Sequence, residues 1–312
     1  MGKKLIPNFF IVGTPKAGTT SFADYLGQHP EVYMSPVKEP RYFSSDIPDR
    51  FQGVKIKPEE YFATRPLAKM HGLCIHRPEH YEQLFAGAGN ARAVGEASVS
   101  YLYSQVAPRR ISEEIADPRI LIFLRNPIER AYSHFQMDVA FGVAATDDFV
   151  KAVEMDVANA NKDVSHLYIE HGRYVPQLKR YLERFPRDRV KICFHDDYRS
   201  DVRKTLLDIL SFLGVERSLS NISLERRAEA QRQAAFPGLL TTLQGSRPYQ
   251  LVRHAIPRDL RSKMKKLLSR RPRRLQHSEF EALIPYFRED VLELSSLLGR
   301  DLTHWLRPRA EA

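Results

Sequence analysis

The stretch FFIVGTPKAGTTS, residues Phe9–Ser21, decides the fold of this chain. Its first part, Phe9–Gly13, is almost entirely apolar, which is typical of a short strand buried on both faces of a parallel sheet. The residues after Gly18 are amphipathic and predict a helix over Thr19–Gln28. A strand, a glycine-containing loop and a helix in this order direct backbone N–H groups and a helix dipole at one point, which suits a phosphate.

The loop has the spacing of a nucleotide-binding P-loop, with one departure. Four residues separate Gly13 from Gly18, as expected, but Thr19 stands where a P-loop has its lysine. Lys16 lies inside the loop instead. It still supplies a point charge to a phosphate or a leaving group, although not in the usual geometry for a nucleoside triphosphate. The departure therefore favours a different phosphate-bearing ligand.

Other apolar runs predict the rest of the sheet. The strongest is Arg119–Leu124, and the helix that follows it starts with a capping Asn126 and a proline. Strands that alternate with helices imply a parallel sheet whose ligands bind beyond the carboxyl ends of the strands. We predict an α/β fold, a P-loop NTPase-like single domain over residues 5–310 with a central parallel sheet flanked by helices. The other predicted elements are strands at Val32–Met34, Ala93–Gly95 and Arg189–Phe194 and helices at Val175–Phe185, Asp201–Leu213 and Asp290–Leu298.

Size and composition allow one large core. The chain has 312 residues, of which 43% are hydrophobic and 28% charged, and nothing in it resembles a linker. No apolar run approaches the roughly 18 residues of a membrane span, and the start lacks the features of a signal peptide. Cys74 and Cys193 make neither a disulfide framework nor a metal site. We therefore expect a cytoplasmic protein; the oligomeric state is left open.

The net charge of +10 is unevenly distributed. Residues 253–274 contain ten Lys and Arg against Asp259 alone, so this basic segment carries a net charge of +9. One interpretation is a solvated surface helix or a mobile loop, and another is a site for an anionic acceptor, nucleic acid or lipid headgroup. Only Tyr249 is near enough in sequence to stack on a base, so we expect no nucleic-acid partner.

A second cluster, LRNPIERAYSHF, contains Arg125 and Ser133. Arg125 leaves the end of a buried strand, where a guanidinium needs an anionic partner or an exit to solvent. Ser133 lies two turns into the following helix. Together they could hold a second phosphate, separate from the one in the first loop. The alternative is an ordinary strand-end charge and an incidental serine.

A third cluster, PVKEPRYFSSD, places Glu39 between Lys38 and Pro40 on a loop at the same edge of the sheet. A carboxylate there could accept a proton from a hydroxyl. The alternative is a surface ion pair between Lys38 and Glu39. Four histidines could also suggest a catalytic base, but isolated histidines are more often structural or surface residues: His71, His76, His80 and His134.

These three segments, in this order, resemble the 3′-phosphoadenylyl sulfate (PAPS) dependent sulfotransferases, especially the carbohydrate and heparan-sulfate type. TPKAGTTS resembles the family's 5′-phosphosulfate loop, RNPIERAYSHF its 3′-phosphate motif, and KEPRYF the segment with its catalytic glutamate. Weaker similarities extend over nearly the whole chain: GEASVSYLY at Gly95–Tyr103, HGRYVPQL at His171–Leu178 and LLGRDLTHWL at Leu297–Leu306.

The resemblance implies in-line transfer of a sulfuryl group from PAPS to an acceptor oxygen, with PAP (3′-phosphoadenosine 5′-phosphate) as the product. Lys16 would stabilise charge on the leaving phosphate, and Glu39 would take the acceptor proton. Arg125 and Ser133 would bind the 3′-phosphate. No metal is required, since a lysine and a helix end could replace Mg²⁺. The 5′-phosphate would be bound by the loop and the first residues of the helix: Pro15, Lys16, Ala17, Gly18, Thr19, Thr20 and Ser21.

The predicted acceptor is a glycan, a glycolipid or another lipid-linked sugar, or a small metabolite, and an anionic acceptor is included. Many carbohydrate-type members have Glu-Lys-Ser/Thr-Pro-x-Tyr where this chain has EASVSY, at Glu96–Tyr101, so the substrate-facing lysine is absent. Arg41 replaces a histidine that is common after the catalytic glutamate. The predicted substrate contacts are Lys38, Arg41, Glu96 and Ser98, and the residues that close over the donor are sought among Arg226, Arg227 and Arg232.

Two other functions are weighed against this one. A P-loop small-molecule kinase would need a lysine directly after Gly18 and an acidic residue at a strand end for Mg²⁺, but Thr19 and Arg125 occupy these positions. A non-catalytic binder of anionic polymers would use the basic segment, but it would leave the arrangement of Lys16 and Glu39 unexplained.

Overall fold

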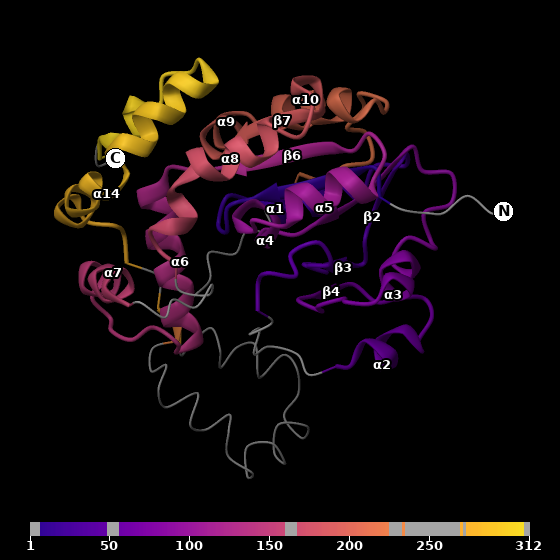
Figure 1. Ribbon diagram of the computed structural model, residues 1–312, viewed down its shortest axis with the longest axis horizontal. Helices are drawn as coiled ribbons and strands as arrows, with labels where there is room; N and C mark the ends of the chain where they lie inside the picture. The colour runs from indigo at the N-terminus through magenta and orange to yellow at the C-terminus, as the bar shows by residue number, and fades with distance from the viewer. Residues whose placement is uncertain are drawn as a thin grey trace, which may run out of the picture.

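The computed structural model describes residues 7–48, 56–159, 167–224 and 273–308, and the backbone of 233–234 and 269–270. A five-stranded sheet forms its centre, in the order β2-β5-β1-β6-β7 (Figure 1). All neighbouring strands are parallel, which confirms the predicted α/β fold with a central parallel sheet. The strands are β1 (Phe9–Gly13), β2 (Val32–Met34), β5 (Ala93–Ala97), β6 (Arg119–Leu124) and β7 (Val190–Phe194).

Helices cover both faces of the sheet because side chains of each strand alternate between the faces. In β1, Phe9 and Ile11 point to the face covered by α1 (Thr19–Leu26) and α10 (Val202–Leu213). Phe10 and Val12 point to the opposite face. That face is covered by α4 (Ser100–Tyr103), α5 (Ala107–Glu114), α6 (Pro127–Phe141), α8 (Tyr174–Leu182) and α14 (His277–Leu298).

The path of the chain through the sheet determines where a ligand can bind. From β1 the chain passes to β2 and β5 on one side, and it then crosses over to β6 on the other side of β1. The connections therefore leave β1 and β6 in opposite directions, although the two strands are paired from Phe9↔Arg119 to Gly13↔Phe123. Such a switch point opens a crevice at the carboxyl ends of the strands.

Smaller elements surround this centre. Strands β3 (Val37–Lys38) and β4 (Met70–His71) form a parallel pair, which lies below the main sheet in Figure 1. Strand β8 (Gln233–Ala234) pairs antiparallel with β9 (Ser269–Arg270). The remaining elements are α2 (Pro58–Phe62), α3 (Pro78–Gln83), α7 (Phe149–Ala158), η2 (Glu170–Gly172), η3 (Arg187–Arg189), α9 (His195–Ser200) and η4 (Thr303–Leu306).

Most predicted elements are present with small changes of bounds. Helix α1 ends at Leu26, and β5 continues to Ala97. The predicted cap of α6 is formed, because the Asn126 side chain accepts hydrogen bonds from Ile128 and Glu129 N–H. Helix α14 is much longer than predicted and begins at His277. None of the helices in the described ranges is both long enough and apolar enough to cross a lipid bilayer.

Candidate active site

The loop after β1 is shaped by two residues with left-handed backbone. Lys16 has φ 74° and Gly18 has φ 96°. Thr14 ties the loop to η2, since its hydroxyl donates to the carbonyl of His171 at 3.0 Å. Helix α1 then starts without a side-chain cap and without an acidic residue in its first turn. The start of α1 is therefore suited to an anion, because the first backbone N–H groups of a helix have no partner within it.

The residues predicted to bind the 5′-phosphate differ in exposure. Thr20 is exposed and Ser21 is half-buried, so both lie at the accessible start of α1. Thr19 and Ala17 are buried, and Ala17 packs in the core on the α1 side of the sheet. Any contact of Ala17 with a ligand would therefore come from its backbone, and a contact of the Thr19 hydroxyl stays a prediction.

Lys16 is a half-buried cation. Its Nζ donates to the sulfur of Met137 on α6 at 3.9 Å. The pKa of Lys16 is lowered from 10.5 to about 8, because burial and, to a lesser extent, Arg125 lower it while Asp138 opposes the shift. The ammonium form still predominates at neutral pH, and a bound dianion would favour it.

Arg125 joins the second cluster to the first loop. Its Nη1 donates to the carbonyl of Lys16 at 3.1 Å, and its Nη2 lies 3.4 Å from Oε2 of Glu129. Its Nε is buried and has no hydrogen-bond partner among the described residues. Burial lowers the pKa of Arg125, while the nearby Glu129 opposes the shift. A cation with an unused, buried N–H fits a further anion at this point.

Ser133 lies on the same face of α6 as two residues that contact this cluster. Glu129, Ser133 and Met137 are four residues apart and so follow one helix face. Glu129 pairs with Arg125, and Met137 contacts Lys16. The half-buried Ser133 is one turn from each of them. Its predicted role in phosphate binding stays a prediction.

Glu39 is held at the end of the neighbouring strand β5. Its backbone has φ 65°, and its N–H donates to the carbonyl of Ala97 at 2.8 Å. Its Oε2 accepts from the N–H of Val99 at 3.0 Å, and its Oε1 accepts from Lys38 at 2.9 Å. The side chain of Glu39 is only 4% exposed, so the pair with Lys38 is not a surface ion pair.

The charge of Glu39 is set by competing effects. Burial alone would raise its pKa, but Lys38, Arg41 and His71 outweigh burial, and the net shift is downward. Glu39 is thus ionised at neutral pH and able to accept a proton.

The two other predicted substrate contacts, Glu96 and Ser98, are enclosed. Glu96 is completely buried and accepts hydrogen bonds from Tyr81, Tyr101 and Ser98. Ser98 is also completely buried. These side chains cannot touch a substrate in this structure, which corrects the role predicted for them. Lys38 and Arg41 are half-buried beside Glu39, and substrate binding stays a prediction for these two.

The three sequence clusters meet at one edge of the sheet. The N–H of Ser98, just beyond β5, donates to the carbonyl of Ile11 in β1 at 3.1 Å. Glu39 therefore lies at the carboxyl end of β5 on one side of β1, and Arg125 lies at the carboxyl end of β6 on the other side. Lys16 follows β1 between them.

Several residues of this site were missed by the sequence reasoning. Tyr198 on α9 packs so close to Gly18 that a Cβ there would lie 2.8 Å from its ring. The hydroxyl of Tyr174 donates to the carbonyl of Arg125 at 2.7 Å. Helix α9 follows β7, so the rule that ligands bind beyond the carboxyl ends of strands could have pointed to Tyr198. Arg226, Arg227 and Arg232 lie outside the described residues.

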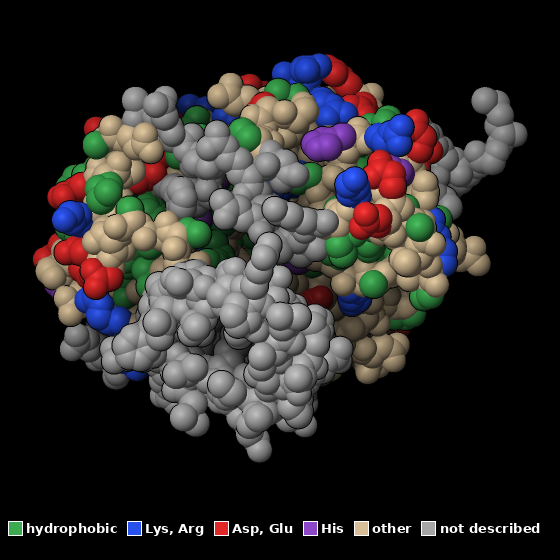
Figure 2. Space-filling model, turned by 90° about the horizontal axis from the view of Figure 1, so that it is seen from below, with side chains coloured by type: hydrophobic (Ala, Val, Ile, Leu, Met, Phe, Trp, Pro, Cys, Tyr) green, Lys and Arg blue, Asp and Glu red, His purple; other side chains and the backbone are tan. Residues whose placement is uncertain are grey.

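The excess positive charge of the basic segment also lies largely outside the described residues, where only the side chains of Arg273 and Arg274 are described. Arg273 pairs with Glu279, and its carbonyl accepts from Tyr132 at 2.7 Å. Figure 2 shows that Lys and Arg are interspersed with Asp and Glu on the described part of the visible face. In the described ranges, no group of three or more His, Cys, Asp or Glu is placed to hold a metal ion.

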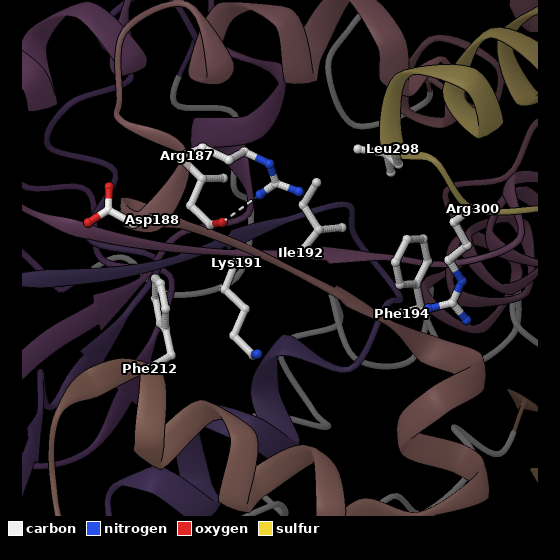
Figure 3. Close-up of a pocket in the computed structure, with 9 residues that line it drawn as sticks. Arg187, Asp188, Lys191, Ile192, Phe194, Phe212, Leu298 and Arg300 are labelled. Carbon is white, nitrogen blue, oxygen red and sulfur yellow. Dashed lines mark hydrogen bonds between the residues drawn. The ribbon is translucent and has the colours of Figure 1, made fainter.

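A groove of about 350 Å³ lies elsewhere, along the outer strand β7 (Figure 3). Arg187 borders it and donates to the carbonyl of Val190 at 2.9 Å. Arg300 lies 3.9 Å above the ring of Phe194 and pairs with Asp197. None of the predicted site residues lines this groove.

Comparison with curated proteins finds similarity to sulfotransferases of carbohydrates. The chain is 23% identical over 251 residues to carbohydrate sulfotransferase 15 of Rattus norvegicus, covering 68% of this chain and 44% of that protein. It is 26% identical over 319 residues to bifunctional heparan sulfate N-deacetylase/N-sulfotransferase 2 of Homo sapiens, covering 97% of this chain and 31% of that protein. The chain thus spans less than half the length of these relatives.

A solved structure is similar over almost the full length. The sulfotransferase from Alicyclobacillus acidocaldarius superposes with a TM-score of 0.69 at 29% identity, covering 96% of this chain and 99% of that one. A model of the sulfotransferase domain matches residues 7–283. The match includes the loop after β1, Glu39 and the start of α6. Because it covers most of the chain, the chain belongs to the sulfotransferase domain family.

Proposed function

We propose that this chain is an enzyme that transfers the sulfuryl group of PAPS to a hydroxyl of a glycan acceptor. The observation that carries the proposal is the hydrogen bond from Arg125 to the carbonyl of Lys16 at 3.1 Å. This bond joins the loop after β1 and the loop after β6 at the switch point of the sheet, and each loop carries a cation that could bind an anion. A ligand with phosphate groups at both ends of an adenosine matches such a pair of sites, and a donor with a single phosphate chain would leave one of them unused.

The side chains suit sulfuryl transfer. When bound, PAPS supplies the activated sulfuryl group and a phosphate leaving group. Lys16 would place its ammonium against the charge that develops on that phosphate, which favours the transition state over the ground state. Arg125 and Ser133 would hold the 3′-phosphate and so fix the donor. Glu39, ionised at neutral pH, would accept the proton of the acceptor hydroxyl.

A glycan is the acceptor class that the relatives support, because their names specify carbohydrate and heparan sulfate. Lys38 and Arg41 flank Glu39, and their positive charges suit an acceptor with carboxylate or sulfate groups. The cytoplasmic location expected from the sequence stays a proposal, and cell fractionation would test it.

Calorimetric titration with PAP tests the donor. We expect micromolar binding by the wild type and a loss of at least tenfold in Arg125→Ala, because that variant removes the guanidinium that links the two loops. Arg187→Ala is the matched control, since Arg187 precedes β7 and lies at the opposite end of the strands. It should bind PAP like the wild type.

The same titration separates the other functions. Preference for ATP with Mg²⁺ over PAP would favour a kinase, and binding of heparin without binding of PAP would favour an anionic-polymer binder. Transfer of label from radioactive PAPS to desulfated heparan sulfate tests the acceptor class. Binding of PAP without transfer to this or any other glycan would refute the glycan acceptor while leaving the donor site intact.

A further inference from the structure

The segment that carries Glu39 has a backbone that requires support. Glu39 has φ 65° and Arg41 has φ 57°, both in the left-handed region that residues with a Cβ rarely adopt. Each such residue costs on the order of 1–3 kcal/mol and persists only where its surroundings fix it. The proton acceptor proposed above is therefore on a strained segment whose geometry depends on contacts made beneath it.

Two chains of hydrogen bonds connect this segment to the buried carboxylate of Glu96. In the first, the N–H of Arg41 donates to Oγ of Ser98 at 3.3 Å, and Ser98 donates to Oε2 of Glu96 at 2.8 Å. In the second, the N–H of Phe43 donates to the hydroxyl of Tyr101 at 3.3 Å, and Tyr101 donates to Oε1 of Glu96 at 2.6 Å. Both chains end on one carboxylate.

We propose that Glu96 is a positioning residue for Glu39: through Ser98 and Tyr101 it holds the strained segment in the geometry in which Glu39 meets the acceptor. The proposal rests on the proposed function for the role of Glu39. It does not make Glu96 a substrate contact or a proton acceptor. Glu96 is completely buried and, in the described residues, bonds only to side-chain hydroxyls.

The hydroxyl groups around Glu96 favour its ionised form. Tyr81 from α3, Tyr101 from α4 and Ser98 all donate to it, and a carboxylate is acceptor-only. The charge of Glu39 also acts on Glu96 and raises its pKa. Glu96 in turn contributes to the raised pKa of Tyr181 on α8. Protonation would place an O–H on Glu96, so the three hydroxyls could no longer all donate to it unchanged, and the hydrogen bonds around the carboxyl would rearrange.

The pKa of Glu96 makes this event accessible near neutrality. The pKa of Glu96 is raised to about 7, because burial and, less strongly, Glu39 raise it by more than the three hydroxyls lower it. Glu39 itself has a lowered pKa and does not titrate in this range. A loss of turnover near pH 7 would therefore report on Glu96.

Hydrogen–deuterium exchange of the unliganded protein tests the link between Glu96 and the segment of Glu39, and it does not depend on enzymatic activity. In Glu96→Gln, the amides of Arg41 and Phe43 should exchange about tenfold faster, the equivalent of one hydrogen bond lost, while strand β6 is unchanged. Ser98→Ala should accelerate Arg41 alone, and Tyr101→Phe should accelerate Phe43 alone. These two variants keep Glu96 and test the two links one at a time, even if Glu96→Gln does not fold. Unchanged exchange in both would overturn the proposal.

Turnover then distinguishes positioning from mere stability. With radioactive PAPS and desulfated heparan sulfate, kcat of Glu96→Gln should fall at least tenfold while the Kd for PAP stays within twofold, because a displacement of about 1 Å can cost that much. The acid limb of kcat should move from about pH 7 to lower pH. Tyr33→Phe is the control, as its hydroxyl donates to a distant carbonyl, that of Leu84, and it should change neither quantity.

The two proposals fail in different ways. A wild type that neither binds PAP nor transfers label would refute the proposed function, whatever the exchange data. An active wild type whose kcat and pH profile are unaffected by Glu96→Gln would refute only the role of Glu96.

Discussion

Lys16 combines a half-buried position with a positive charge, and this combination has a cost for folding. The pKa of Lys16 is lowered from 10.5 to about 8, first by burial and then by Arg125. The unfolded chain therefore binds more protons than the folded one between about pH 8 and 10.5, so stability rises with pH in that window. A charge that is retained against this cost is consistent with a role in binding an anion.

Lys16→Met separates this cost from the function. The variant keeps the shape of the side chain but removes its charge, so we expect turnover to fall at least a hundredfold. At pH 7 its free energy of unfolding should exceed that of the wild type by on the order of 1–3 kcal/mol, and the difference should shrink by pH 10. Urea unfolding at both pH values is the measurement. A variant that is less stable than the wild type at both would contradict the assigned cost.

Glu39 is the residue on which the proposed chemistry depends most directly. Glu39→Gln should lower kcat by about 10²–10⁴-fold, the usual worth of a general base, and leave the affinity for PAP unchanged. Glu279→Gln is a matched control, because Glu279 is also a buried carboxylate in an ion pair, with Arg273, but it lies on α14. Near-normal kcat in Glu39→Gln, with the control also active, would remove Glu39 from this role.

The start of α1 depends on a glycine for two reasons. Gly18 has φ 96°, and an added Cβ would lie 2.8 Å from the ring of Tyr198, which packs edge-on against Phe22 and so has little room to move. Gly18→Ala should therefore cost about 1–2 kcal/mol of stability for the backbone conformation, plus a steric part, and should weaken PAP binding at least tenfold.

Gly89→Ala isolates the backbone part of that effect. Gly89 has φ 53°, and a Cβ added there meets nothing within 4 Å. Its variant should lose stability of about 1–2 kcal/mol, again for the backbone conformation, without any loss of PAP affinity. Chemical unfolding and calorimetry of both variants are the measurements. Equal PAP affinity in the two variants would mean that Tyr198 does not shape the donor site.

The elements that could be predicted from the sequence are those whose own residues are mostly apolar, because an apolar run indicates a buried strand. Strands β1, β2 and β6 have the predicted bounds because both of their faces are apolar. Strand β5 was predicted too short, since Glu96 interrupts its apolar pattern and the tyrosines that satisfy this carboxylate, Tyr81 and Tyr101, lie outside the strand. Helix α14 contains Pro285, a residue that is unfavourable inside a helix. The helix is nevertheless maintained, because its apolar residues pack against the core.

The site could be predicted in part. In a parallel sheet the carboxyl ends of all strands lie at one edge, and ligands bind in the loops that follow them. The order of the strands is not visible in the sequence. Strands β1 and β6 are far apart in the chain, yet they are neighbours in the sheet, and this adjacency brings Arg125 to the carbonyl of Lys16. The same limit explains why Glu96 was predicted to face a substrate: its position directly after a predicted strand was indicated, but not what covers it.

At the scale of the whole molecule, the proposed donor must bridge both sides of the switch point at once. Saturating PAP should therefore slow amide exchange together in the loop and helix start at 14–21 and in the segment 125–133. It should leave the edge at 186–192 unchanged, since the groove there is separate. At a hundredfold excess over Kd the free energy of unfolding should rise by about 2.7 kcal/mol, and this gain should fall to about 1.4 kcal/mol or less in Arg125→Ala under the same concentrations. Protection of only one of the two segments would show that they do not hold the same ligand, because a donor bound at a single loop has no means of ordering the other.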